Sequence, residues 1–330
     1  MFAKTQGVSF TRTATIGRQE LHLSANALKR ILLDFGYSPA ANEVTDLMEQ
    51  ADGFAEPLLE ALGAIEIRSF DASPYEGASN VHDFNSPIDP GFKNYFTVVI
   101  DSGTLEHIFN FPTAIKNCME MVAVGGHFIG ITPMNNFVGH GFYQFSPELF
   151  FRIFSESNGF RIRRMIAFEH RPGADWFAVA DPAAIKERVS LVNAQPTLLM
   201  VIAEKVAAVQ VFAAPPQQSD YVDLWQSKDA EPEPGSLPSP AVINAPHFRA
   251  GLFARIARRL YGFAPAPVKR LYRRTGVFRP FSNPRFFRRL RVPQVQQASL
   301  PLLVPPSGRG LVTPHGAGER SRPPTSFPKR

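Results

Sequence analysis

One stretch of the chain, residues 95–133, has the pattern of a strand, a helix and a second strand. Residues 96–100 form an apolar, β-branched run, which is typical of a strand buried on both faces. Residues 112–122 then carry apolar side chains at helical spacing, and Gly125-Gly126 marks the end of this helix. An apolar strand resumes at residues 128–132. This order predicts a β-α-β crossover, which joins parallel strands.

Similar patterns of strand and helix alternate from residue 43 to residue 204. The predicted strands are residues 43–48, 65–70, 79–84, 96–100, 128–132, 160–168 and 197–204, and the predicted helices are 25–35, 57–62, 112–122, 147–154 and 182–189. The alternation indicates an α/β fold with a mostly parallel sheet and helices on both faces. Ligands of such sheets bind beyond the carboxyl ends of the strands, so residues 101–107 are the first candidate for a functional loop.

The charges divide the chain into two parts. Residues 1–233 hold 17 Lys/Arg against 28 Asp/Glu, whereas residues 234–330 hold 18 Lys/Arg and a single acid, Glu319. Thirteen of these basic residues lie between 246 and 292, among Phe, Leu and Tyr side chains. We interpret the pattern as an acidic globular body that carries a basic arm.

Composition predicts five regions along the chain. They are a flexible N-terminus (1–20), a globular domain (21–206), a Pro-rich linker (207–245), a basic aromatic arm with a helix at 250–263 (246–292), and a disordered tail (293–330). Cys118, the single cysteine, is expected in the core because it lies on the apolar face of its helix. Neither an apolar run of about 18 residues nor a secretory signal is found, which predicts a cytoplasmic protein.

Two motifs carry a resemblance to a known family. Residues 101–107 read DSGTLEH, and residues 122–128 read VAVGGHF. A D…LEH loop after the fourth strand, followed at this spacing by a Gly-Gly turn before the fifth, resembles class I S-adenosylmethionine-dependent methyltransferases. The resemblance covers about residues 43–204. It implies a Rossmann-like sheet of seven strands, mostly parallel, with an antiparallel last strand at residues 197–204.

The resemblance also implies the cofactor S-adenosyl-L-methionine and positions for its contacts. Asp71, at the end of the second strand, would bind the ribose hydroxyls, because a carboxylate accepts hydrogen bonds from both. Asp83 would lie near the adenine, with Phe84 as a stacking face. Asp101 and Ser102 would face the methionine portion. The alternative for Asp71 is that it only caps a turn.

Two further positions follow from the same resemblance. Glu106 belongs to the cofactor-side loop, where it and His107 either contact the ligand or orient the loop. The family's glycine-rich loop follows the first strand and lets the backbone approach the cofactor closely. With the first strand at residues 43–48, this loop is residues 49–56, in which Gly53 is the one glycine. The sequence departs from the family pattern at this loop.

The groups that act on the methyl acceptor are expected in the loop after residues 128–132. Methyl transfer is an in-line displacement, so the protein supplies alignment and, for acceptors of high pKa, a general base. His140, between two glycines, is the predicted base or acceptor contact, with Tyr143 and then Asn136 as further candidates. The alternative for His140 is a hydrogen bond that orders the loop. The histidines lack metal-ligand spacing, so no metal site is predicted.

The predicted function is a methyltransferase that acts on a small-molecule or glycan-type acceptor; the aromatic, Asn and His side chains of the acceptor loop favour a glycan. The alternative is a non-catalytic binding or scaffold protein of the same fold. A nicotinamide-dependent oxidoreductase is disfavoured by the absence of GxGxxG after the first strand and by the antiparallel last strand.

Three roles of the arm at residues 246–292 stay open. They are a solvated tail, contact with anionic lipid at the inner face of the membrane, and contact with nucleic acid. The acidic body disfavours nucleic acid because it would repel phosphates.

Overall fold

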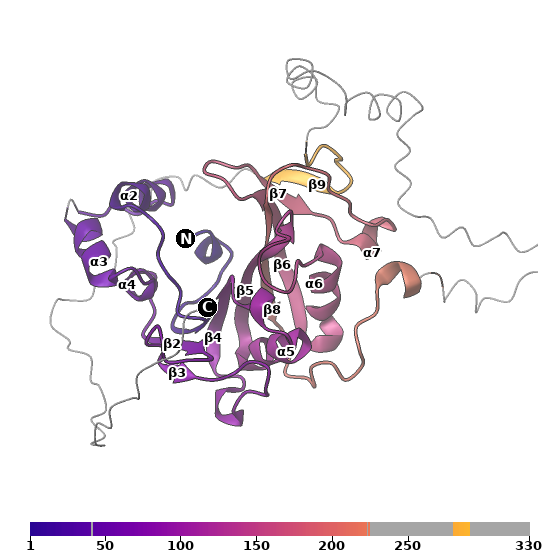
Figure 1. The fold of residues 1–330 in the computed structure, drawn as a ribbon, viewed down its shortest axis with the longest axis horizontal. Helices are drawn as coiled ribbons and strands as arrows, with labels where there is room; N and C mark the ends of the chain where they lie inside the picture. The colour runs from indigo at the N-terminus through magenta and orange to yellow at the C-terminus, as the bar shows by residue number, and fades with distance from the viewer. Residues whose placement is uncertain (41, 223, 225–279, 291–330) are drawn as a thin grey trace, which may run out of the picture.

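The computed structural model describes residues 1–40, 42–222, 224 and 280–290 (Figure 1). The helices in these ranges are α1 (Phe2–Thr5), α2 (Ala25–Asp34), α3 (Glu43–Ala51), α4 (Glu56–Ala61), α5 (Phe111–Met121), α6 (Pro147–Ile153) and α7 (Pro182–Ile185). Short 3-10 turns are η1 (Pro90–Phe92), η2 (Leu105–His107) and η3 (Glu156–Asn158). The strands are β1 (Arg12–Ile16), β2 (Glu66–Asp71), β3 (Asn80–Val81), β4 (Phe96–Ser102), β5 (Val122–Asn135), β6 (Phe160–Glu169), β7 (Trp176–Val179), β8 (Thr197–Lys205) and β9 (Phe287–Leu290). No helix in the described ranges is long and apolar enough to cross a bilayer.

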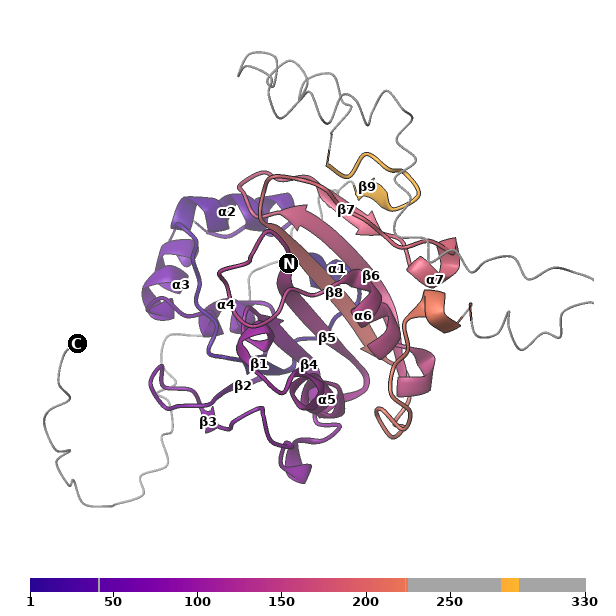
Figure 2. The ribbon, with the colours of Figure 1, turned by 45° about the vertical axis from the view of Figure 1, so that its right-hand side comes forward.

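The described strands form one sheet in the order β3-β2-β1-β4-β5-β8-β6-β7-β9 (Figure 2). The first five strands of this order pair in parallel. β8 pairs antiparallel with both β5 and β6, so it runs against two neighbours that point the same way. The predicted α/β class and the reversed strand at 197–204 are confirmed. The predicted count of seven strands is wrong, because β7 and β9 extend the sheet beyond β6.

The first strand is β1, in the middle of the sheet between β2 and β4. The predicted flexible N-terminus at 1–20 is therefore wrong. The sequence RTATI has little hydrophobicity, but β-branched threonines suit a pleated strand. Thr13 is fully buried, and its hydroxyl donates to the Phe10 carbonyl (2.7 Å). Because β1 pairs with β2 and with β4, its backbone N–H and C=O groups form hydrogen bonds on both sides. These bonds stabilise the strand although its side chains are weakly apolar.

Residues 43–51 form helix α3, so the predicted strand at 43–48 is also wrong. Val44 and Leu47 are buried, and Met48 packs beside them. These positions are three and four residues apart, which places them on one face of a helix. Together with α1, α2 and α4, this helix covers one face of the sheet. Ser24 caps α2 as predicted, since its Oγ accepts a hydrogen bond from the Ala27 N–H (3.2 Å).

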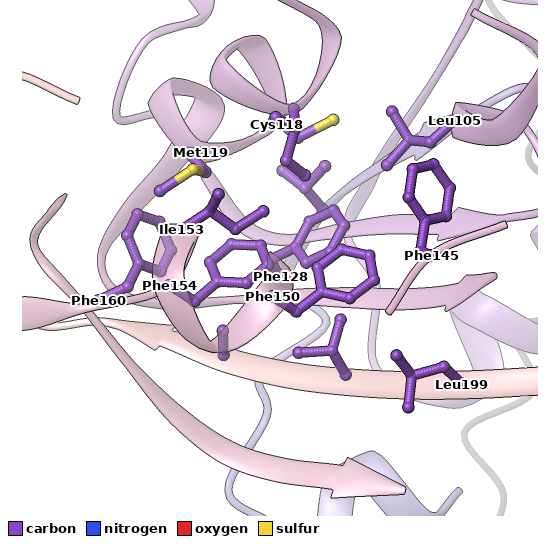
Figure 3. Close-up of a cluster of buried hydrophobic side chains, with 14 of the residues drawn as sticks. Leu105, Cys118, Met119, Phe128, Phe145, Phe150, Ile153, Phe154, Phe160 and Leu199 are labelled. Atoms are coloured by element: carbon purple, nitrogen blue, oxygen red, sulfur yellow. The ribbon is translucent and has the colours of Figure 1, made fainter. Parts of the chain in front are cut away.

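The opposite face of the sheet is covered by α5 and α6, with an aromatic core beneath them (Figure 3). Phe154 stacks on Phe128 and on Phe150, with ring centroids 5.0 and 6.1 Å apart. Cys118 is fully buried in this core, as predicted, and burial raises the pKa of its thiol well above the usual range. The thiol is thus a packing group.

The β4-α5-β5 crossover is confirmed, with one change at its second turn. Helix α5 ends at Met121, and Gly125-Gly126 lies inside β5. A Cβ at Gly126 would come 2.8 Å from the Thr97 carbonyl oxygen. The glycine is therefore needed where β5 bulges against β4, and it does not end the helix.

Residues 280–290, the described part of the basic arm, belong to the globular body. β9 pairs antiparallel with β7, and Phe281 stacks on Phe177 with ring centroids 4.3 Å apart. Phe286 and Phe287 are buried. The predicted boundary of the domain at residue 206 is therefore wrong. The predicted helix at 250–263 and the tail at 293–330 lie outside the described residues.

Candidate functional site

The carboxyl ends of the central strands form one row of residues at the edge of the sheet. Ile16, the last residue of β1, is in register with Phe70 of β2 and with Asp101 of β4. The next residues along these three strands are Gly17, Asp71 and Ser102. The strand order runs from β1 towards β3 on one side and from β4 towards β5 on the other. In open α/β sheets, ligands bind in the crevice at such a reversal.

Gly17 is the glycine that follows the first strand. It has a φ of +73°, and a Cβ there would come 2.6 Å from Thr104 Oγ1. That hydroxyl donates to the Ile16 carbonyl (2.8 Å), so the loops after β1 and β4 are in direct contact. Gly53, which was predicted for this position, lies instead in the turn between α3 and α4 with open space around it. Its assignment depended on the misplaced first strand and is corrected to Gly17.

Arg18 joins three segments beside this row. Its Nε donates to Glu56 Oε1 of α4 (2.7 Å), and a terminal nitrogen donates to the Glu76 carbonyl (2.8 Å). The guanidinium also lies 3.7 Å from the ring centroid of Phe54. The loop after β1 is thus fixed by a single side chain to α4 and to the loop after β2. The sequence analysis missed both Gly17 and Arg18, although Thr-x-Thr-Ile before a glycine was a usable strand signal.

The structure separates the two acids predicted for the adenosine portion. Asp71 ends β2 in the row, and its Oδ1 accepts a hydrogen bond from the Ser73 N–H (3.0 Å). Asp83 lies two residues beyond the end of β3, where hydrogen bonds from the backbone and side chain of Asn85 lower its pKa. Phe84 is 3% exposed and packs edge-on against Phe70, so its predicted role as an adenine-stacking face is wrong.

Asp101 is fully buried at the end of β4. Its Oδ1 accepts hydrogen bonds from the N–H groups of Thr104 (3.1 Å) and Leu105 (3.2 Å), and its Oδ2 has no partner in the described chain. Burial, with a smaller effect of the nearby Glu106 carboxylate, raises the pKa of Asp101 well above its usual range. Asp101 therefore holds the loop in shape, while the exposed Ser102 next to it is the residue available to a ligand.

Glu106, His107 and His140 come together on the next part of this edge. The Glu106 side chain is 1% exposed, whereas that of His140 is 50% exposed, and His140 Nε2 lies 3.3 Å from Glu106 Oε1. The rings of His107 and His140 meet edge to face with centroids 4.8 Å apart. Burial raises the pKa of Glu106, and the two imidazoles act in the opposite direction. The predicted acceptor residue His140 is thus joined to the predicted cofactor-side loop.

The rest of the predicted acceptor loop is held by its own contacts. The Tyr143 hydroxyl donates to the Phe109 carbonyl (2.6 Å). Asn136, which has a φ of +61°, donates to Asn193 Oδ1 and to the Gln195 carbonyl (2.9 Å each). Both side chains therefore order the loop in this conformation.

The segments that carry His107 and His140 also expose apolar side chains, which together are called the apolar rim. Phe109 and Phe142 are 72% and 66% exposed, and their rings meet edge to face with centroids 5.8 Å apart. Val138 is 89% exposed on the same loop. Exposed aromatic side chains beside a polar group are typical of a surface that binds a ligand.

A cavity of about 720 Å³ lies elsewhere, between α6, α7 and residues 216–220. Its lining includes the ion pair of Arg152 with Glu148 (3.4 Å). None of the predicted site residues lines this cavity. The residues predicted for the site therefore lie at the sheet edge and not at this cavity.

Comparisons with known proteins return matches of fold only. No family model matches the chain, and no curated protein matches it. Among solved structures, the CMeT domain of the citrinin polyketide synthase is 14% identical over 38% of this chain, with a TM-score of 0.23. This chain spans only 29% of that chain's length.

Two further solved structures are also similar. The branched-chain polyamine synthase from Thermus thermophilus, with N4-aminopropylspermidine and 5'-methylthioadenosine, is 11% identical over 66% of this chain and 58% of its own (TM-score 0.33). The 16S rRNA (adenine(1408)-N(1))-methyltransferase from Catenulisporales acidiphilia is 10% identical over 63% and 91% (TM-score 0.30). TM-scores this low assign no function to the chain.

Proposed function

We propose that this chain is an S-adenosylmethionine-dependent methyltransferase whose cofactor site is the crevice between β1 and β4. The observation that carries the proposal is the row Asp71, Gly17 and Ser102 at the strand-order reversal, in a sheet in which β8 runs antiparallel to its two neighbours. This row combines the carboxylate of Asp71, a glycine without a side chain and the hydroxyl of Ser102 at the place where an α/β sheet binds ligands. The reversed β8 also argues against the nicotinamide-dependent alternative.

The residues of the row fit the chemical groups of the cofactor. Asp71 has a carboxylate suited to two vicinal ribose hydroxyls. Gly17 leaves the backbone bare where a ligand has to approach closely. The buried Asp101, whose Oδ2 has no hydrogen-bond partner among the described residues, fixes the loop that presents Ser102. When bound, S-adenosyl-L-methionine would supply an electrophilic methyl group, which leaves sulfur for the acceptor in a single displacement.

His140 is the proposed general base, with Glu106 as the residue that positions it. An oxygen or nitrogen acceptor gives up its proton as it takes the methyl group, and an exposed imidazole can accept that proton. The buried carboxylate 3.3 Å from Nε2 orients the ring and stabilises the imidazolium that forms. Ser102 ends β4, and His140 lies in the loop after the neighbouring strand β5. Tyr143 is proposed to order the rim and not to carry a proton.

The acceptor is proposed to be a small molecule or a glycan. Phe109 and Phe142 form an exposed apolar surface beside the polar side chains of Glu106 and His140. A sugar ring presents apolar C–H faces together with hydroxyls, which matches such a mixed surface. The proposal predicts methyl transfer to a hydroxyl or amine on a ring-shaped acceptor.

Calorimetric titration of S-adenosylhomocysteine into the full chain tests the cofactor site. We expect saturable binding by the wild type and an increase in Kd of about 10- to 100-fold in Asp71→Ala, since hydrogen bonds to a charged group contribute roughly 1.5–3 kcal/mol. Asp89→Ala is the matched control, because Asp89 Oδ1 makes the same kind of turn hydrogen bond, to the Gly91 N–H (2.7 Å), before β4. Equal affinities of the two variants would remove Asp71 from the site.

A binding or scaffold role of the same fold is the second candidate. The loop after β1 reads GRQE, with one glycine, and Arg18 is already engaged by Glu56 and Glu76. Both features favour a loop held rigid by its own contacts over a glycine-rich loop that closely approaches a cofactor. Absence of any heat from the wild type at millimolar S-adenosylhomocysteine would favour this candidate.

A further inference from the structure

The cluster of Glu106, His107 and His140 has the donor set of a metal site. One possible ligand atom from each of these residues lies within 4.8 Å of the other two. On a strand, the neighbours Glu106 and His107 would point to opposite faces and could not share an ion. These residues form the 3-10 turn η2 instead, so that objection does not apply.

The backbone places His140 on this turn. The N–H of Phe142 donates to the Glu106 carbonyl (2.7 Å), which fixes the acceptor loop to η2. Gly141 has a φ of +69°, and a Cβ there would come 2.8 Å from the same carbonyl oxygen. A side chain at position 141 would push the loop away, so the glycine keeps His140 against Glu106.

An independent observation points to a missing ligand. Glu106 Oε2 is buried and has no hydrogen-bond partner in the described part of the chain. Leaving a buried charged oxygen unpaired is costly, typically more than the roughly 1–3 kcal/mol of a neutral group. A bound cation would give the buried Glu106 carboxylate the partner that it lacks among the described residues.

We propose that Glu106, His107 and His140 bind one divalent first-row transition metal ion such as Zn²⁺. Two imidazoles and one carboxylate are the ligands of many Zn²⁺ and Fe²⁺ sites, whereas Mg²⁺ and Ca²⁺ prefer oxygen alone. The two imidazoles are exposed and can rotate to close the ligand set around the ion. Three protein ligands leave at least one coordination position of such an ion open to a further ligand.

The metal site and the general base use the same histidine. A ring nitrogen bound to a metal cannot accept a proton, so in the metal-bound chain an acceptor hydroxyl would be activated by coordination to the ion. This consequence depends on the proposed function. Metal binding itself does not depend on the proposed function, because it is measured without the cofactor.

Titration of ZnCl₂ into the chelator-treated full chain, followed by calorimetry, tests the site. We expect one saturable site whose affinity falls at least about tenfold in Glu106→Gln and in His107→Ala, since even indirect ligand changes cost 10- to 100-fold. Glu20→Gln is the matched control, because Glu20 pairs with His22 (2.9 Å) on an exposed surface with no third ligand. Its Zn²⁺ affinity should equal that of the wild type.

Cobalt(II) provides a second measurement that does not depend on heat. Visible absorption bands on binding Co²⁺ should develop in the wild type and be lost in His107→Ala, whose exposed side chain can be removed without disturbing the core. The proposal would be overturned by no saturable site in the wild type, or by equal affinity of wild type, Glu106→Gln and His107→Ala. Either result leaves the cofactor titration unaffected, so the two proposals fail separately.

Discussion

Replacing Gly159 with alanine is expected to lower the free energy of unfolding by about 3–5 kcal/mol. Gly159 has a φ of +75°, and a Cβ there would lie 2.3 Å from the Ala207 carbonyl oxygen. The Gly159 carbonyl also accepts hydrogen bonds from the N–H groups of Val206 (2.8 Å) and Ala207 (3.2 Å). The residue thus joins the start of β6 to the end of β8, and a side chain would force apart the strand pair that defines the fold.

Gly173→Ala is the matched control for this substitution. Gly173 has a similar φ of +67°, but a Cβ there would meet no atom within 4 Å. It should cost only the backbone strain, roughly 1–2 kcal/mol. Urea denaturation followed by circular dichroism measures both variants. Equal losses would show that Gly159 is not packed against Ala207, and would count against the observed β6-β8 connection.

The second large effect is expected at Lys205, at the end of β8. Its side chain is 3% exposed, and the ammonium donates to Asn94 Oδ1 (2.7 Å) and to the carbonyls of Met119 (3.0 Å) and Val122 (2.8 Å). The two carbonyls lie at the end of α5, where a helix leaves acceptors unpaired. Lys205→Met should cost about 3 kcal/mol or more, since it leaves buried oxygens without donors. Lys116→Met, on the exposed side of α5, should change stability by less than about 0.5 kcal/mol.

The same lysine predicts a pH dependence. Burial lowers the pKa of Lys205 to about 8, against about 10.4 in the unfolded chain. Between these values the unfolded state holds a proton that the folded state has released, so stability rises with pH. The wild type should therefore gain up to about 2 kcal/mol relative to Lys205→Met between pH 8 and pH 9.5. A stability difference that stays flat or shrinks over this range would contradict the lowered pKa.

Periodicity in the sequence predicted the elements with strong apolar patterns. The crossover of β4, α5 and β5, the end of β2 at Asp71 and the strand β8 all lie where they were expected. β1 was not predicted because its alternating pattern consists of threonines, and its stability comes from pairing with strands on both sides. β9 was not predicted because its arginines indicated a solvent-exposed basic arm, although Phe287 is buried. In both cases tertiary contacts outweigh the local signal.

The positions of the candidate site residues in the fold were predicted in part for similar reasons. Loop positions after strands can be read from the sequence, so Asp71, Ser102 and His140 were assigned to the ligand edge. The contact between Glu106 and His140 could not be read, because it depends on how two loops fold against each other. The same holds for Phe84, whose burial against Phe70 removes it from the ligand edge.

Hydrogen exchange with and without S-adenosylhomocysteine is the most direct test of the proposed cofactor crevice. The account predicts slower exchange of the backbone amides at residues 17–21, 71–79 and 102–105, because ligand binding stabilises the loops it contacts. In Asp71→Ala the same ligand concentration should give little protection. Protection confined to other segments, such as the cavity at residues 216–220, or none at saturating ligand, would contradict the assignment of the cofactor site to the crevice between β1 and β4.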